Sequence, residues 1–147
     1  MPESAVPRGY ILAFDFGLRR IGVAVGQTTT QTATALRTVS NGPEPDWAAV
    51  DRLVAEWRPQ LLVVGLPLGA EGEETDMSKA ARRFGGTLGS RYELSVEYAD
   101  ERLTSRAAGG RFAELRAAGQ LRRKHAGQLD AISAQIILEN WLQSAHV

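Results

Sequence analysis

The sequence predicts an α/β fold in which a mixed β-sheet carries helices on both faces. The first two apolar runs are separated by only four residues, which is too short for a crossover and predicts an antiparallel hairpin. A later run, 60–66, is apolar throughout, as expected of a central strand that is covered on both faces. The predicted order of elements, three strands followed by α-β-α-β-α-α, completes the pattern.

The amino-terminal part accounts for three strands. Tyr10–Phe16 (YILAFDF) is a short apolar run that ends at Gly17, and residues 21–25 (IGVAV) return after the turn. Residues 32–39 are rich in β-branched side chains and suit a third strand at the edge of the sheet. The Asn-Gly-Pro sequence at 41–43 then interrupts the chain.

The rest of the chain alternates between helices and strands. Residues 47–57 place apolar side chains at helical spacing, with Asp46 as N-cap, and Pro59 ends this helix. After the strand at 60–66 the sequence predicts, in order, a Gly- and Glu-rich loop at 67–75, a helix at 76–90, a strand at 94–99, a basic helix near 103–117, a loop at 119–127 and a last helix at 128–143.

Length and composition narrow the classes of protein. The 147 residues favour a single domain, 10–147, after a flexible leader at 1–9. The absence of cysteine excludes thiol catalysis and Cys-ligated metal sites, and the presence of only two histidines excludes a multi-histidine site. Any metal would therefore be held by carboxylates, which favour magnesium or manganese. Neither an apolar stretch long enough for a membrane span nor a signal peptide is recognisable, so we expect a cytoplasmic protein.

The formal net charge of zero conceals a gradient along the chain. Residues 1–75 carry six basic and nine acidic side chains (−3), whereas 76–147 carry eleven basic and eight acidic ones (+3). Within 102–125 the only acid is Glu114, against seven basic residues: Arg102, Arg106, Arg111, Arg116, Arg122, Arg123 and Lys124. Such a segment suits a phosphate backbone, and the alternative interpretation is a solvated helix face.

Three acids stand where apolar residues would be expected. Asp15 lies inside the first strand, although it could also be a turn or cap residue. Glu101 directly follows the strand at 94–99, where α/β sheets tend to bind ligands, but an acid also suits the first turn of a helix. Asp130 shares a helical face with apolar residues 4, 7 and 11 positions later, and it could equally belong to a helix cap.

These carboxylates would be more informative together than separately. Two such charges about 4 Å apart repel by about 4 kcal/mol at an effective dielectric constant near 20. A cluster of them persists only when it is protonated or neutralised, and a divalent cation is the natural partner. The chemistry that matches such a site is hydrolysis of a phosphodiester. Spacing alone does not establish that the three acids converge.

Four motifs in order give a specific resemblance. They are FDFGLRRIGVAVG (14–26), VVGLPLGAEG (63–72), DERLTS (100–105) and LDAISAQIILE (129–139). At these residues the chain resembles the YqgF family, also called RuvX-type or Holliday-junction-resolvase-like proteins, which are regarded as nucleases of pre-16S rRNA. The resemblance implies an RNase H-like fold, a five-stranded mixed sheet flanked by helices.

The resemblance also implies roles for individual residues. Asp15, Glu101 and Asp130 match the catalytic acids that bind Mg²⁺ or Mn²⁺, and Asp100 is a possible neighbour in a supporting position. The arginines and lysine expected to hold the nucleic acid are Arg19 and Arg20 in the turn, Arg102 beside Glu101, and Arg106, Arg122, Arg123 and Lys124. For each of these basic residues an ordinary surface position is the alternative.

The function implied by the resemblance is metal-dependent hydrolysis of phosphodiester bonds in 5′-end maturation of pre-16S rRNA, a step of ribosome biogenesis. Precursor rRNA would then be the partner. Two alternatives stay open: a Holliday-junction resolvase that acts on branched DNA in recombination and repair, and a non-catalytic factor associated with RNA or the ribosome.

Overall fold

The computed structural model describes residues 9–101 and 126–145 of the chain. The basic helix expected near 103–117 lies outside the described residues, as do the candidate ligands of nucleic acid Arg102, Arg106, Arg122, Arg123 and Lys124. In the described part, no helix is long and apolar enough to cross a membrane.

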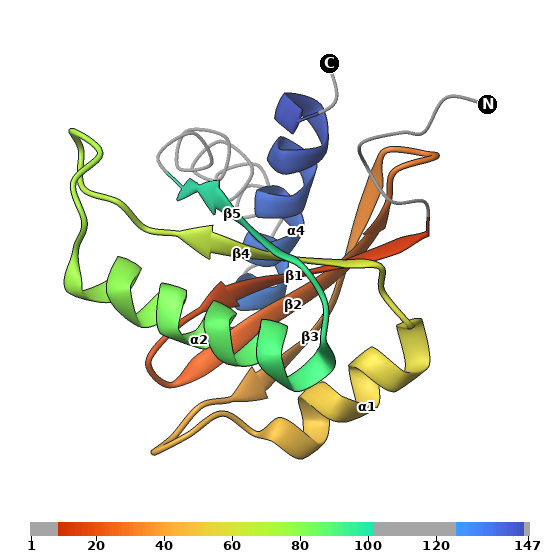
Figure 1. Ribbon diagram of the computed structural model, residues 1–147, viewed down its shortest axis with the longest axis horizontal. Helices are drawn as coiled ribbons and strands as arrows, with labels where there is room; N and C mark the ends of the chain where they lie inside the picture. Colours follow the sequence, from red (N-terminus) through yellow and green to blue (C-terminus); the bar gives the residue numbers. More distant parts are fainter. Residues whose placement is uncertain (1–8, 102–125, 146–147) are drawn as a thin grey trace.

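A five-stranded sheet forms the centre of the molecule (Figure 1). Its order is β3-β2-β1-β4-β5. The central strand β1 runs antiparallel to β2 and parallel to β4, which is in turn parallel to β5, so the predicted mixed sheet and its hairpin are confirmed. The strands are β1 (Tyr10–Phe16), β2 (Arg20–Gln27), β3 (Thr32–Ser40), β4 (Leu61–Leu66) and β5 (Val96–Asp100).

Helices cover both faces of this sheet, as the sequence predicts. Helices α1 (Trp47–Trp57) and α2 (Asp76–Tyr92) pack on one face, and α4 (Ala126–Ala145) packs on the other. The alternation of side chains along β1 divides the core: Leu12 and Phe14 pack with α1 and α2, whereas Ile11 and Ala13 pack with α4. The same alternation directs the side chain of Asp15, the next odd-numbered residue of β1, toward α4.

Capping residues set the ends of the helices that precede the site. The side chain of Asp46 accepts a hydrogen bond from the backbone N of Ala49 at 3.2 Å, which confirms it as the N-cap of α1. Thr75 and Ser78 form a capping box at the start of α2. At the end of α2 Glu93 adopts a left-handed conformation (φ 54°), and the backbone N of Leu94 donates to Gly89.

This cap corrects two predicted boundaries. The helix expected to end at 90 continues to Tyr92, and the strand expected at 94–99 spans Val96–Asp100 instead. The shift arises because residues 93 and 94 terminate the helix before the strand can begin. The last helix likewise includes Ala126, two residues earlier than expected.

Helix α4 also reaches the edge strand β3. The side chain of Gln135 accepts a hydrogen bond from the backbone N of Ala35 at 3.0 Å, and its Nε2 donates to Glu139 at 3.2 Å. A helix side chain thus satisfies a backbone group of β3, which is an edge strand of the sheet among the residues that the structure describes.

Candidate active site at the carboxyl ends of three strands

The carboxyl ends of β1, β4 and β5 meet at one edge of the sheet, on the left in Figure 1. Asp15 is the penultimate residue of β1, Asp100 is the last residue of β5 and Glu101 follows directly. Because Asp15 follows Ile11 and Ala13 in the alternation, its side chain faces α4, which carries Asp130. This edge therefore receives all three predicted acids.

Two glycines make room for the acids on either side of Asp15. Gly22 of β2 is the direct partner of Asp15, and a Cβ at Gly22 would overlap the backbone carbonyl of Asp130. Gly65 of β4 lies one position beyond the last registered pair of β1 and β4, and a Cβ there would lie 2.8 Å from Oε2 of Glu101. The start of α4 thus sits over one glycine, and the carboxylate of Glu101 sits over the other.

Burial and mutual repulsion raise the pKa of two of these acids well above their usual range. Burial is the largest cause for Asp15, followed by the negative charges of Glu101 and Asp130, and its pKa rises to about 8. Burial followed by the charge of Asp100 raises the pKa of Glu101 to about 7. The three acids are therefore close enough to interact electrostatically, and such clusters of perturbed carboxyls are typical of functional sites.

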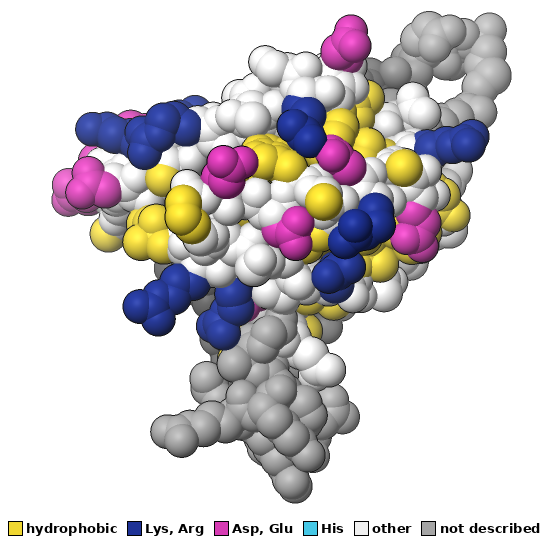
Figure 2. Space-filling model, turned by 90° about the horizontal axis from the view of Figure 1, so that it is seen from below, with side chains coloured by type: hydrophobic (Ala, Val, Ile, Leu, Met, Phe, Trp, Pro, Cys, Tyr) yellow, Lys and Arg dark blue, Asp and Glu magenta, His cyan; other side chains and the backbone are white. Residues whose placement is uncertain are grey.

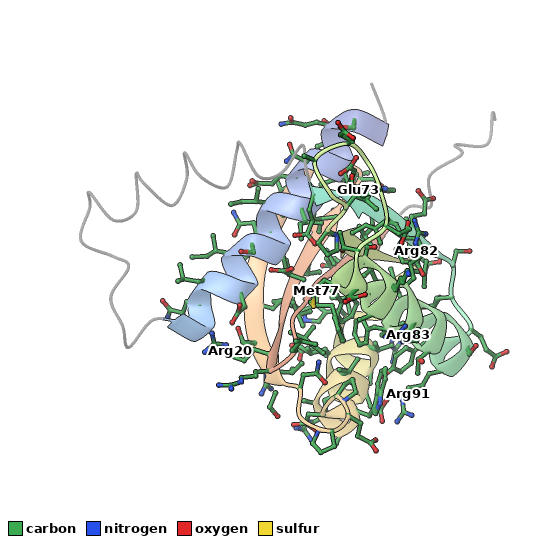
Figure 3. The ribbon with its side chains drawn as sticks, turned by 90° about the vertical axis from the view of Figure 1, so that its left-hand side faces the viewer. Arg20, Glu73, Met77, Arg82, Arg83 and Arg91 are labelled. Carbon is green, nitrogen blue, oxygen red and sulfur yellow. The ribbon has the colours of Figure 1, made fainter. Side chains whose placement is uncertain are left out.

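Asp130 differs because a cation already lies beside it. Nε of Arg20 is 2.9 Å from Oδ2 of Asp130. Burial raises the pKa of Asp130, and the guanidinium of Arg20 opposes that rise. The sequence predicted Arg20 as a contact for phosphate, whereas in this structure its side chain joins the turn of the hairpin to α4, as its position beside that helix in Figure 3 illustrates.

The three acids offer the type of ligand atom, carboxylate oxygen, that a hard divalent cation prefers. Asp15, Glu101 and Asp130 offer only carboxylate oxygens, and Oδ2 of Asp130 is shielded from solvent with the guanidinium of Arg20 as its neighbour. Among residues 9–101 and 126–145, however, no three such side chains are gathered into a ready metal-binding group. The guanidinium of Arg20, and not a cation shared with the other two acids, lies beside Oδ2 of Asp130.

The turn between β1 and β2 is closed by its own backbone. Gly17 N donates to the carbonyl of Arg20 at 2.9 Å, and a Cβ at Gly17 would lie 2.7 Å from that oxygen. Glycine at this position is thus a requirement of the turn. Arg19 lies exposed in the same turn, where its side chain is available to a ligand, and its carbonyl accepts from the backbone N of Asn41 at 2.8 Å.

The loop at 67–75 leaves β4 at the same edge and is itself folded. Gly69 N donates to the carbonyl of Glu73 at 2.9 Å, and the hydroxyl of Thr75 donates to the carbonyl of Pro67 at 2.8 Å. Glu73 appears in Figure 3, which faces this edge, above Met77 of α2. The loop therefore borders the site as an ordered segment.

Sequence reasoning missed Gly22 and Gly65, which the structure places on both sides of Asp15. A signal was present, because a glycine inside an otherwise apolar strand marks a close approach of backbone or ligand. Both glycines lie within such runs, IGVAV and LLVVGL.

Comparison with known proteins gives a consistent result. A family model described as "RuvX: Holliday junction resolvase" matches residues 9–144. Relatives named "Putative pre-16S rRNA nuclease" include one from Dechloromonas aromatica, 46% identical over 139 residues (94% of this chain and 93% of the relative). Another, from Xylella fastidiosa, is 48% identical over 145 residues (97% and 94%).

Solved structures show the same fold at low sequence identity. Thermus thermophilus RuvC in complex with a Holliday junction substrate aligns with a TM-score of 0.55 and 16% identity, covering 93% of this chain and 95% of RuvC. The Holliday junction resolvase of fowlpox virus aligns with a TM-score of 0.56 and 12% identity, covering 94% and 99%. The RNase H-like fold expected from the sequence is confirmed.

Proposed function

Because this chain belongs to the RuvX family, we propose that it is a metal-dependent nuclease that hydrolyses phosphodiester bonds, with precursor 16S rRNA as its substrate. One observation carries the proposal: Asp15 is half-buried at the end of the central strand, and the charges of Glu101 and Asp130 contribute to raising its pKa to about 8. Partly buried acids that repel one another are costly in a fold, and a cation-dependent reaction explains why they stand together.

The acids and the arginines near the end of β1 would have different roles in this reaction. Asp15, Glu101 and Asp130 would hold Mg²⁺ or Mn²⁺, which supplies the charge that activates a water molecule and stabilises the leaving oxygen. The strand register fixes Asp15, and the space over Gly65 fixes the carboxylate of Glu101. Arg19 extends from the turn beside these acids, where it can orient a phosphate through its guanidinium.

Arg20 has two partners available to it. In this structure it neutralises Asp130, and its side chain is about half exposed (53%), so it can turn outward. A phosphate that takes Arg20 would release Asp130 toward Asp15 and Glu101. Binding of substrate would thereby complete the set of carboxylates that the reaction needs.

The choice of RNA as substrate is supported by the names of the relatives, which refer to pre-16S rRNA. Branched DNA is the second candidate, because the matching family model is described as a Holliday junction resolvase. Under the first candidate the protein acts in ribosome biogenesis, and we place it in the cytoplasm.

A paired cleavage assay tests the proposal. The full chain is incubated with labelled precursor 16S rRNA or with a four-way DNA junction, in Mg²⁺, Mn²⁺ or EDTA. We expect cleavage of the RNA in either metal, none in EDTA and none by Asp15→Asn, while the control Glu56→Gln, at an exposed position of α1, cuts normally. Cleavage of the junction alone would favour the second candidate. If neither substrate is cut with either metal, the protein is not the nuclease proposed here and a non-catalytic RNA-associated role replaces it.

A further inference from the structure

A second concave site lies on the other face of the sheet, beyond the turn that follows Asp15. It is a pocket of about 490 Å³ between the β1–β2 turn, the segment that leads into α1, and α2. That volume is in the range of about 300–1,000 Å³ typical of small-ligand sites. Residues that shape it are Phe16, Leu18, Pro43, Trp47, Arg83 and Thr87.

We propose that this pocket binds an unpaired nucleobase of the substrate strand, which makes single-stranded nucleic acid the preferred substrate class. The inference rests on the nuclease function proposed above. It concerns a different surface, because the pocket lies on the α1–α2 side and the acids face α4.

The inner wall of the pocket is a fixed aromatic surface. The rings of Trp47 and Phe84 are stacked with centroids 5.8 Å apart and an interplanar angle of 23°, and Phe16 lies 5.0 Å from Phe84. The guanidinium of Arg91 lies 4.9 Å from the centroid of the Trp47 ring and also binds Asp51 through two hydrogen bonds of 2.8 Å. These contacts hold the rings in place, and the partly exposed Phe16 and Trp47 leave aromatic surface in the pocket of the kind on which single-stranded nucleic acids stack their bases.

The turn connects this wall to the candidate active site. Asp15 and Phe16 are consecutive in β1, so their side chains point to opposite faces of the sheet. Leu18 lies at the tip of the turn, 68% exposed, although it is a large hydrophobic residue. A strand whose phosphate lies at Asp15 needs to pass only this turn to place a neighbouring base beside Leu18 and Phe16.

The rim of the pocket has polar groups that match a nucleotide. Arg83 is exposed on α2, where it can meet a backbone phosphate. In Figure 3 it lies on the side of α2, whereas Arg20 lies on the side of α4. Glu44 offers a carboxylate that can accept hydrogen bonds from the amino groups of a base. In the view from below in Figure 2, hydrophobic side chains are exposed among both basic and acidic side chains. A base inside a duplex is stacked and paired, so only an unpaired base fits such a pocket.

Binding in EDTA tests the pocket without any cleavage. The probe is a fluorescently labelled single-stranded RNA of about 12 nucleotides, which is within the usual length of such sites, and a duplex of the same sequence is the comparison. Ala80 lines the pocket, so Ala80→Trp fills it, whereas Ala55→Trp adds the same side chain on the exposed face of α1. Leu18→Ser is a second variant, and its position at the exposed tip leaves the core intact.

We expect Ala80→Trp to weaken binding of the single strand by about 5- to 150-fold, the range that stacking of one base contributes, and Leu18→Ser to weaken it in the same direction. Ala55→Trp should bind as the unchanged chain does, and none of the three should alter binding of the duplex. Melting curves establish that each variant is folded.

The outcomes separate the two proposals. If the chain cuts no RNA but both pocket variants still lose affinity for the single strand, the pocket stands and the nuclease function falls. If Ala80→Trp and Leu18→Ser bind single-stranded RNA normally, the pocket proposal is overturned whatever the cleavage assay shows. A change in the oligomeric state of Ala80→Trp with unchanged RNA binding would assign the pocket to a second copy of the chain, and that also overturns it.

Discussion

Nε of Arg20 lies 2.9 Å from Oδ2 of Asp130, so the first residue of β2 is tied to α4 at the position of a candidate metal ligand. A guanidinium and a divalent cation compete for the same carboxylate. Partly exposed ion pairs stabilise a fold by only about 0.2–1 kcal/mol, and a metal ion that binds Asp130 has to overcome the same free energy.

Removing this competitor should strengthen metal binding. We expect Arg20→Gln to bind Mn²⁺ about 1.5- to 5-fold more tightly than the unchanged chain, which is the equivalent of that free energy. Titration followed by electron paramagnetic resonance of free Mn²⁺ measures it, and Arg52→Gln on the exposed face of α1 is the matched control. Weaker or unchanged Mn²⁺ binding by Arg20→Gln would contradict the competition.

A side chain at Gly22 should destabilise the fold. In Gly22→Ala the added methyl group overlaps the carbonyl of Asp130, and backbone on both sides leaves little room for adjustment. We expect the free energy of unfolding in urea to fall by about 1–3 kcal/mol, the usual cost of overpacking. Gly86→Ala in α2 is the control, because its Cβ would meet nothing within 4 Å, and it should gain about 0.5–1 kcal/mol. Equal stability of the two variants would show that α4 does not press on β2 here.

A side chain at Gly65 should affect activity more than stability. Its Cβ would lie 2.8 Å from Oε2 of Glu101 and 2.6 Å from Cδ1 of Ile137, and both are the ends of side chains that can move. Displacement of Glu101 by about 1 Å can cost about 10²-fold in rate. We therefore expect Gly65→Ala to lower kcat strongly on precursor RNA with little change in KM, and to weaken Mn²⁺ binding. An unchanged kcat would remove Glu101 from the catalytic set.

The raised carboxyl pKa values predict how stability depends on pH. In the folded chain the pKa of Asp15 is about 8 and that of Glu101 about 7, whereas both are close to 4 in an unfolded chain. Between pH 4 and 8 the folded state therefore binds more protons than the unfolded state, and stability falls as the pH rises through this window.

Calorimetry in EDTA at pH 5 and pH 8 measures the effect. We expect a lower Tm at pH 8, recovery of Tm when Mn²⁺ is added at pH 8, and a smaller difference between the two pH values in Asp15→Asn. A Tm that is equal or higher at pH 8 in EDTA would mean that Asp15 and Glu101 are not protonated in the folded chain.

Periodicity was sufficient to predict the elements that carry Asp15 and Asp130 and the faces of those elements that are buried. The spacing that joins Asp130 to Ala134, Ile137 and Trp141 predicted a helix face directed at the sheet, and these three apolar residues are buried. The alternation in β1 placed Asp15 within a strand whose neighbours are core residues. Patterns of this kind are local, so a single sequence contains them in full.

Other features depend on elements that are far apart in the chain. The pairing of Arg20 with Asp130 spans 110 residues, and no spacing rule connects the two. The strand β5 begins later than the sequence predicts because the backbone of Glu93 and Leu94 forms the cap that ends α2. The roles of Gly22 and Gly65 follow from what lies across from them in the folded molecule, which the sequence indicates only as two glycines inside strands.

The hydrogen bond from the backbone of Ala35 to the side chain of Gln135 has a consequence for behaviour at high concentration. An outer strand with unpaired N–H groups is a template on which another polypeptide can add, and this is a common start of aggregation. The N–H of Ala35 already donates to Gln135 within the molecule, so it is not available to form a backbone hydrogen bond with an added strand. Gln135→Leu would remove the acceptor from this N–H and leave it open to an added strand, although Gln135 stands on the same helix as Asp130.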